Sequence, residues 1–127
     1  KRNGWQGTRD IAAFLSIPSA IKFQREHNWH DIREHCHLLA VRTRERVTAL
    51  TGLPPIAPDS WFAQMFSVTL PAGNDDLKDN LYRRYHIELP IIAWNDQNMM
   101  RVSFQGYNTM SDADALINAL RDMLKTS

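Results

Sequence analysis

The sequence predicts an α+β fold: a two-layer sandwich in which a small, mostly antiparallel sheet of about three strands is covered by helices on one face. Three observations lead to this prediction. An apolar stripe with helical spacing runs through the first half of the chain, and strand-like alternation appears in the second half. Two of the strand-like segments are joined by a polar link too short for a crossover, which favours an antiparallel pair.

The first half of the chain is expected to be helical. Asp10 can cap a short helix that ends at Leu15, and Ser16 can cap a second helix that has Pro18 in its first turn. A longer helix is expected over residues 31–51. Its apolar stripe recurs at intervals of three and four residues and consists of Ile32, Cys36, Leu39, Thr43, Val47 and Leu50.

The second half of the chain changes its hydrophobic period. Residues 66–70 alternate between apolar and polar side chains, which predicts a half-buried strand. A helix is expected over residues 75–85. Residues 87–94 and 99–104 are predicted to form two strands of a hairpin, joined by the polar link 95–98.

Two groups of polar residues are expected at helix surfaces. The last helix is predicted to begin at Ser111, with Asp114 three residues on as the partner in a capping pair. Arg42, Arg44 and Arg46 alternate with polar neighbours inside the long helix. We interpret these arginines as a solvated helix face rather than a binding patch.

The composition argues against several classes of partner. The net charge is only +1, from 15 basic and 14 acidic residues, so we expect neither nucleic acid nor a membrane surface as a partner. No apolar run approaches the roughly 20 residues that span a bilayer. The single cysteine, Cys36, excludes an intrachain disulfide and fits a reducing compartment, so we expect a cytoplasmic protein.

Four histidines lie close to Cys36 in the sequence and raise the question of a metal site. His35 and His37 point about 200° apart on a helical wheel, and His27 and His30 precede the predicted long helix. Zinc ligands must converge tetrahedrally, which this spacing does not favour. We therefore expect no metal site, and we interpret Cys36 as a small core residue.

Arg101 and the pair Gly7-Thr8 are the candidate binding residues. Arg101 lies inside an apolar strand, where a guanidinium group is costly to bury without an anionic partner. Its side of the strand, shared with Ser103, is either simply exposed to solvent or directed towards a ligand carboxylate. Gly7 and Thr8 precede a helix and offer hydrogen-bond donors to an anion, although most such pairs are only caps.

Two segments of the chain resemble the isopenicillin N epimerase-like group of class V aminotransferases. The first is the string Trp-Gln-Gly-Thr-Arg-Asp at residues 5–10, together with residues 13–21. The second is residues 101–109, which include Tyr-Asn-Thr, followed by Asp114-Ala115-Leu116. The predicted elements between these segments are in the order that the family has, so the resemblance spans nearly the whole chain.

The resemblance implies a pyridoxal phosphate (PLP) enzyme that is a homodimer when full length. Gly7 and Thr8 would contact the cofactor phosphate of the other subunit, and Arg101 would bind the α-carboxylate of an amino-acid substrate. Residues 1–28 would be a loop and helices at the end of the PLP-binding large domain. Residues 29–127 would be the C-terminal small domain of a fold type I PLP enzyme.

The resemblance also implies that the catalytic residues lie elsewhere. The family's Schiff-base lysine and the aspartate that pairs with the pyridine nitrogen precede Gly7-Thr8, where this sequence has only Lys1 as a lysine. We therefore expect a piece of a longer protein that holds no catalytic residue, is inactive alone and does not bind PLP by itself. Epimerase, aminotransferase and lyase reactions all stay open.

Two alternatives are weighed against this interpretation. The chain could be a non-catalytic α/β binding or interaction domain. A cysteine desulfurase is disfavoured, because that group has its nucleophilic cysteine in the loop between the last two strands. Here the link 95–98 contains no cysteine, and Cys36 lies in the predicted long helix.

Overall fold

The structure, a computed structural model, describes residues 10–124 and divides into two units, the first ending at Asp31 and the second beginning at Ile32. The first unit contains α1 (Ala12–Leu15) and α2 (Ile17–Glu26). As predicted, Asp10 supports the start of α1, since its Oδ1 accepts a hydrogen bond from the Ala12 amide at 2.8 Å. Ser16 is the N-cap residue of α2, as predicted, but its hydroxyl makes no capping bond and donates to the Ala13 carbonyl instead, at 2.9 Å.

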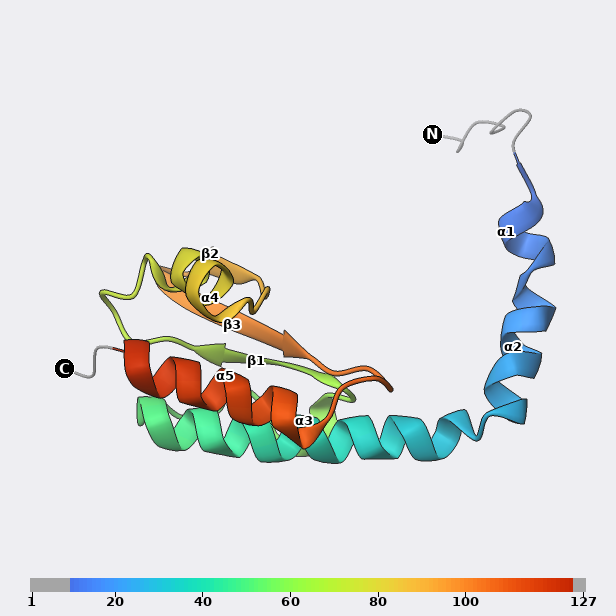
Figure 1. Ribbon diagram of the computed structural model, residues 1–127, viewed down its shortest axis with the longest axis horizontal. Coiled ribbons are helices and arrows are strands. Elements are labelled where there is room, and N and C mark those ends of the chain that lie inside the picture. Colours follow the sequence, from blue (N-terminus) through green and yellow to red (C-terminus); the bar gives the residue numbers. More distant parts are fainter. Residues whose placement is uncertain (1–9, 125–127) are drawn as a thin grey trace. The chain divides into compact units, whose positions relative to one another are not determined.

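Within the described residues, the second unit contains a three-stranded sheet, three α-helices and a short 3-10 helix, η1 (Asp59–Trp61), in the chain order α3, η1, β1, α4, β2, β3, α5. The bounds are α3 (Trp29–Thr51, which begins just before the division), β1 (Met65–Thr69), α4 (Leu77–Tyr85), β2 (Ile91–Trp94), β3 (Gln97–Ser103) and α5 (Met110–Met123). The strand order is β1-β3-β2, and both pairs are antiparallel. The predicted α+β fold, with helices packed on a small antiparallel sheet, is confirmed (Figure 1).

The core of this unit lies between one face of the sheet and the helices. Phe66, Val68, Met100 and Val102 point from β1 and β3 into it, because alternate residues of a strand lie on the same face. All three helices contribute buried side chains, which are Cys36, Leu39, Ala40, Val47, Leu77, Leu81, Ala113, Leu116, Ile117, Ala119 and Leu120. The apolar residues that recur with helical spacing and those that alternate along the strands therefore pack together in a single core.

The hairpin between β2 and β3 is tighter than predicted. Its turn consists of Asn95 and Asp96 alone, with φ angles of 51° and 58°. Two consecutive residues with positive φ match the right-handed twist of the flanking strands, and Asn and Asp tolerate this conformation. Gln97 and Asn98, expected in the link, instead already pair with β2.

The last helix begins at Met110, one residue earlier than predicted, and has a different cap. Thr109 and Asp112 form the capping box, in which the Thr109 amide donates to the Asp112 carboxylate at 2.8 Å. The predicted partner, Asp114, instead forms an ion pair with Arg46 of α3 at 2.7 Å. This ion pair joins α3 and α5 where they lie side by side (Figure 1).

The interpretation of the arginine group in α3 as a solvated face is wrong for Arg44. Arg42 is exposed and Arg46 is half-buried, but Arg44 is only 9% exposed. Its guanidinium donates to the Ala57 carbonyl at 2.6 Å, pairs with Asp59 and lies 5.4 Å from the centre of the Phe62 ring. Arg44 therefore fixes the connector between α3 and β1 against the helix.

No helix within residues 10–124 has both the length and the apolar character needed to cross a lipid bilayer.

We predict that Asp112→Ala destabilises the second unit by about 0.5–1 kcal/mol at neutral pH, because it removes one half of the capping box. The hydrogen bond from the Thr109 amide holds the Asp112 pKa below its usual value, so the stabilisation exists above the unfolded-state pKa and is lost as the pH falls through the folded-state pKa. Urea unfolding at pH 7 and at acidic pH measures the difference. Ser111→Ala, in the same turn, is the control; a deficit equally large at acidic pH would contradict the explanation.

We predict that Arg44→Met destabilises the second unit by about 1–2 kcal/mol. The substitution removes the bond to Ala57 and leaves Asp59, whose side chain is 44% exposed, without its cation. Arg42→Met is the matched control on the same helix and should change the unfolding free energy by less than about 0.5 kcal/mol, since Arg42 is exposed. Equal effects of the two variants in chemical unfolding would show that the connector does not depend on Arg44.

Candidate functional site

Arg101 lies in the middle of the central strand, on the face of the sheet that points away from the helices. Its neighbours Met100 and Val102 are buried in the core, whereas Arg101 and Ser103 are exposed. Arg101 stands opposite Ser67 of β1, and its backbone amide donates to the Pro90 carbonyl at 3.0 Å, just before β2. The backbone of this residue is thus hydrogen-bonded on the β2 side, while its side chain faces outward.

The face around Arg101 mixes this positive charge with apolar side chains. We call it the open face. By alternation and register it consists of Met65, Ser67, Thr69, Ile92, Trp94, Gln97, Met99, Arg101 and Ser103. Met65, Ile92 and Trp94 are 48%, 49% and 64% exposed. Apolar neighbours lower the local dielectric constant, which strengthens the attraction between a guanidinium group and an anion.

The charge of Arg101 is not compensated within the described part of the chain. Arg44 and Arg46 each form an ion pair with an aspartate, whereas Arg101 forms none among residues 10–124. An anion can therefore bind to Arg101 without breaking an existing ion pair. The planar guanidinium group can donate two parallel hydrogen bonds to a carboxylate. Of the two interpretations of Arg101, solvent exposure is shown, and binding of a carboxylate is compatible with it.

The segment that follows β3 is held in a defined turn. The Gln105 amide donates to the Asn108 side-chain oxygen at 2.8 Å, and the Asn108 amide donates back to the Gln105 carbonyl at 2.8 Å. Tyr107 lies within this turn and is 81% exposed. The sequence analysis includes this tyrosine only as part of the Tyr-Asn-Thr string of the resemblance and gives it no role, because neither periodicity nor charge marks it.

The other predicted site residues, Gly7 and Thr8, lie outside the described residues 10–124. Their predicted contact with a cofactor phosphate therefore remains a prediction.

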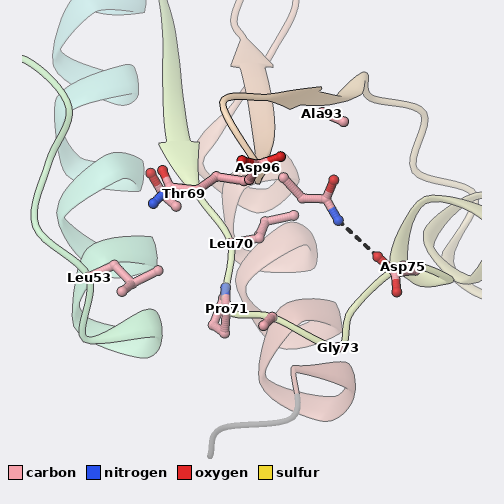
Figure 2. Close-up of a pocket in the computed structure, with 11 residues that line it drawn as sticks. Leu53, Thr69, Leu70, Pro71, Gly73, Asp75, Ala93 and Asp96 are labelled. Carbon is pink, nitrogen blue, oxygen red and sulfur yellow. Dashed lines mark hydrogen bonds between the residues drawn. The ribbon is translucent and has the colours of Figure 1, made fainter.

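A hollow of about 700 Å³ lies at the end of β1, beside the turn between β2 and β3 (Figure 2). Its lining includes two carboxylates, Asp75 and Asp96, and no basic side chain. Asn98, which also lines it, donates a hydrogen bond to Asp75 at 3.0 Å, drawn as the dashed line that ends at Asp75 in Figure 2. Arg101 does not line this hollow, and its negative lining is unsuited to a carboxylate or a phosphate, so we do not place the anion site there.

The cysteine and the histidines have structural roles where they are described. Cys36 is 2% exposed, and burial raises the pKa of its thiol, which disfavours the reactive thiolate. His37 Nδ1 lies 2.7 Å from the Ala63 carbonyl and holds the connector near α3. Among residues 10–124, no group of three or more His, Cys, Asp or Glu side chains is arranged to hold a metal ion.

The fold and the outward arginine together define an α+β domain whose sheet exposes an arginine that forms no ion pair among residues 10–124. Among proteins of known name, the chain is similar to isopenicillin N epimerase of Amycolatopsis lactamdurans, at 36% identity over 94% of the chain. It is similar to isopenicillin N epimerase of Streptomyces clavuligerus at 31% identity over 91% of the chain. It also matches a probable chloroplastic L-cysteine desulfhydrase of Arabidopsis thaliana, at 27% identity over 97% of the chain.

These similarities support a class V aminotransferase-like family for the chain. The chain spans about 30% of the length of the relatives, with the matched part amounting to 31%, 30% and 30% of each. No protein-family profile matches the chain.

Proposed function

We propose that this chain is the C-terminal part of a PLP-dependent enzyme that acts on an amino acid or a small peptide, by epimerase, aminotransferase or lyase chemistry. The observation that carries the proposal is Arg101, an exposed arginine in the central strand that forms no ion pair among the described residues. The similarity to an epimerase and a desulfhydrase supports the PLP-dependent kind of enzyme.

In this proposal Arg101 binds the α-carboxylate of the substrate. Two hydrogen bonds from one rigid guanidinium group fix both the position and the plane of the carboxylate, and thereby the direction of the bonds at the α-carbon. Met65, Met99 and Ile92 share the open face with Arg101 and place apolar side chains on it. The role of this chain is therefore to bind and orient the substrate.

The described residues fit a substrate-binding part of a PLP site rather than a whole one. PLP, when bound, supplies an electron sink for the α-carbon of the substrate. The described lysines do not lie on the open face: Lys22 pairs with Glu26 along α2 at 3.6 Å, and Lys78 lies in α4. The lysine that holds the cofactor and moves the α-proton would thus come from the large domain, and Gly7 and Thr8 would contact the phosphate of the other subunit in a homodimer.

The segment that contains α1 and α2 has the surface expected of a part that packs against another domain. Neither helix has a buried residue. The exposed apolar side chains of this segment are Ile11, Phe14, Leu15, Ile17, Ile21 and Phe23. Such a concentration of exposed apolar groups is typical of surfaces that are covered in an assembly. We propose that residues 1–28 belong to the large domain and that this domain is the partner.

A cysteine desulfurase remains the disfavoured alternative. The turn between β2 and β3, where that group has its nucleophile, consists of Asn95 and Asp96. Cys36, the only cysteine in the sequence, lies in α3 and is buried.

We predict that, in the full-length protein, Arg101→Ala raises the dissociation constant for the amino-acid substrate by about 30- to 1,000-fold, because a bidentate bond to a carboxylate contributes roughly 2–4 kcal/mol. The absorbance change of bound PLP on titration with amino acids measures the constant. Arg83→Ala, which removes another exposed arginine from α4, is the matched control and should leave it within about two-fold.

An unchanged constant for Arg101→Ala would remove Arg101 from the proposed role. A full-length protein that binds neither PLP nor amino acids would instead favour the non-catalytic binding or interaction domain.

A further inference from the structure

A small pocket lies at the β1 edge of the sheet, where the connector from α3 meets the strand. Its volume is about 160 Å³. The lining residues are Arg44 of α3, Ile56, Ala57 and Phe62 of the connector, and Met65, Phe66 and Ser67 of β1. Apart from Arg44 and Ser67, every lining side chain is apolar.

One residue, Ser67, connects the pocket with Arg101. Ser67 lines the pocket and stands directly opposite Arg101 in the ladder between β1 and β3. Residues opposite each other in antiparallel strands have Cα atoms about 4.5–5.5 Å apart, and their side chains lie on the same face. A carboxylate held by Arg101 therefore places the rest of a small ligand within reach of the pocket.

The two arginines near the pocket differ in what they can bind. Arg44 is already neutralised by Asp59, and one of its donors is used by the Ala57 carbonyl. Arg101 has no carboxylate partner among residues 10–124. A second carboxylate of the ligand would have no unpaired cation to bind in the pocket. An apolar group of the ligand would contact Ile56, Phe62 and Met65.

The walls of the pocket are held in place from α3. Arg44 fixes Ala57 and Asp59, and His37 fixes Ala63 at 2.7 Å. The Phe62 ring packs against the rings of His37 and Phe66, with centroids 5.6 Å and 6.0 Å apart. Because a preformed pocket does not need to be ordered on binding, it can discriminate between side chains of different size.

We infer that this pocket is the subsite for the substrate's side chain and selects an apolar side chain of about leucine or methionine size. At about 30 Å³ for each water-sized group, 160 Å³ holds roughly five non-hydrogen atoms. The inference rests on the proposed function, since it takes the α-carboxylate to be bound by Arg101. It adds to the proposed function the kind of side chain that the substrate carries.

The test is the ratio of the affinities for L-leucine and L-alanine in the full-length protein with bound PLP, measured by titration. The unmodified protein is expected to bind leucine about ten-fold more tightly than alanine, because leucine buries three more carbons in a half-open pocket. Ile56→Trp fills the pocket and should bring this ratio close to one. A ratio that stays the same in Ile56→Trp overturns the inference.

Leu38→Trp is the matched control. Leu38 is 50% exposed and Ile56 is 49% exposed, so the two substitutions add the same bulk at similarly exposed positions, but Leu38 does not line the pocket. The control should keep the ratio of the unmodified protein. A second variant, Ile56→Ala, enlarges the pocket and should shift the preference from leucine towards phenylalanine; no shift would also count against the subsite.

The failure of this inference can be told apart from the failure of the proposed function. If Arg101→Ala weakens the binding of both amino acids but Ile56→Trp leaves their ratio unchanged, only the side-chain subsite is wrong. If Arg101→Ala changes neither affinity, the carboxylate role is wrong, and the subsite loses its basis with it. If the full-length protein binds neither amino acid, both proposals fail.

Discussion

The position of β3 between two antiparallel neighbours is the constraint on which the candidate site depends. Because β3 pairs with β1 on one side and β2 on the other, its register is set twice. Met100 and Val102 must face the helices, since they complete the core, and Arg101 must then face away. A slip of one residue would bury a guanidinium group and expose two core side chains, which costs far more than any local adjustment could recover. The outward direction of Arg101 thus follows from packing on the other side of the sheet.

Two arginines of this domain show how the surroundings decide the role of the same side chain. Arg44 is buried, and its guanidinium group contacts a carbonyl, a carboxylate and an aromatic ring within the fold. It fixes the connector that forms one wall of the pocket beside β1. Arg101 is exposed and forms no ion pair among residues 10–124, which leaves its donors available for the proposed ligand. The two arginines therefore have complementary roles in the proposal. Arg44 fixes one wall of the pocket, and Arg101 provides the positive charge that binds the carboxylate.

Features that depend on local periodicity could be predicted from the sequence, and features that depend on distant partners could not. The alternation of residues 66–70 predicted the first strand, and the short polar link predicted the hairpin that contains residues 99–104; exposure was one of the two interpretations of Arg101. The burial of Arg44 could not be predicted, because Asp59 and Phe62 reach it only after the connector folds back. The cap of α5 was misplaced because Thr109-Asp112 and Ser111-Asp114 have the same spacing, and Asp114 is taken by Arg46. The pocket beside β1 has no signal in the sequence, since it combines residues from α3, the connector and the strand.

The arrangement suggests how specificity and chemistry are divided in the proposed enzyme. The relatives are named for an epimerase and a desulfhydrase, two different reactions, and this chain is similar to both along more than nine-tenths of its length. A residue that only holds an α-carboxylate is useful to either reaction, so Arg101 cannot determine which one occurs. The substrate's other end must be recognised by surfaces that differ between such enzymes. The connector is suited to this task, because its Ile56 lines the pocket beside β1 while Arg44 and His37 hold its backbone. In this scheme, changes in a short loop alter the substrate without disturbing the strand that binds the group common to all amino acids.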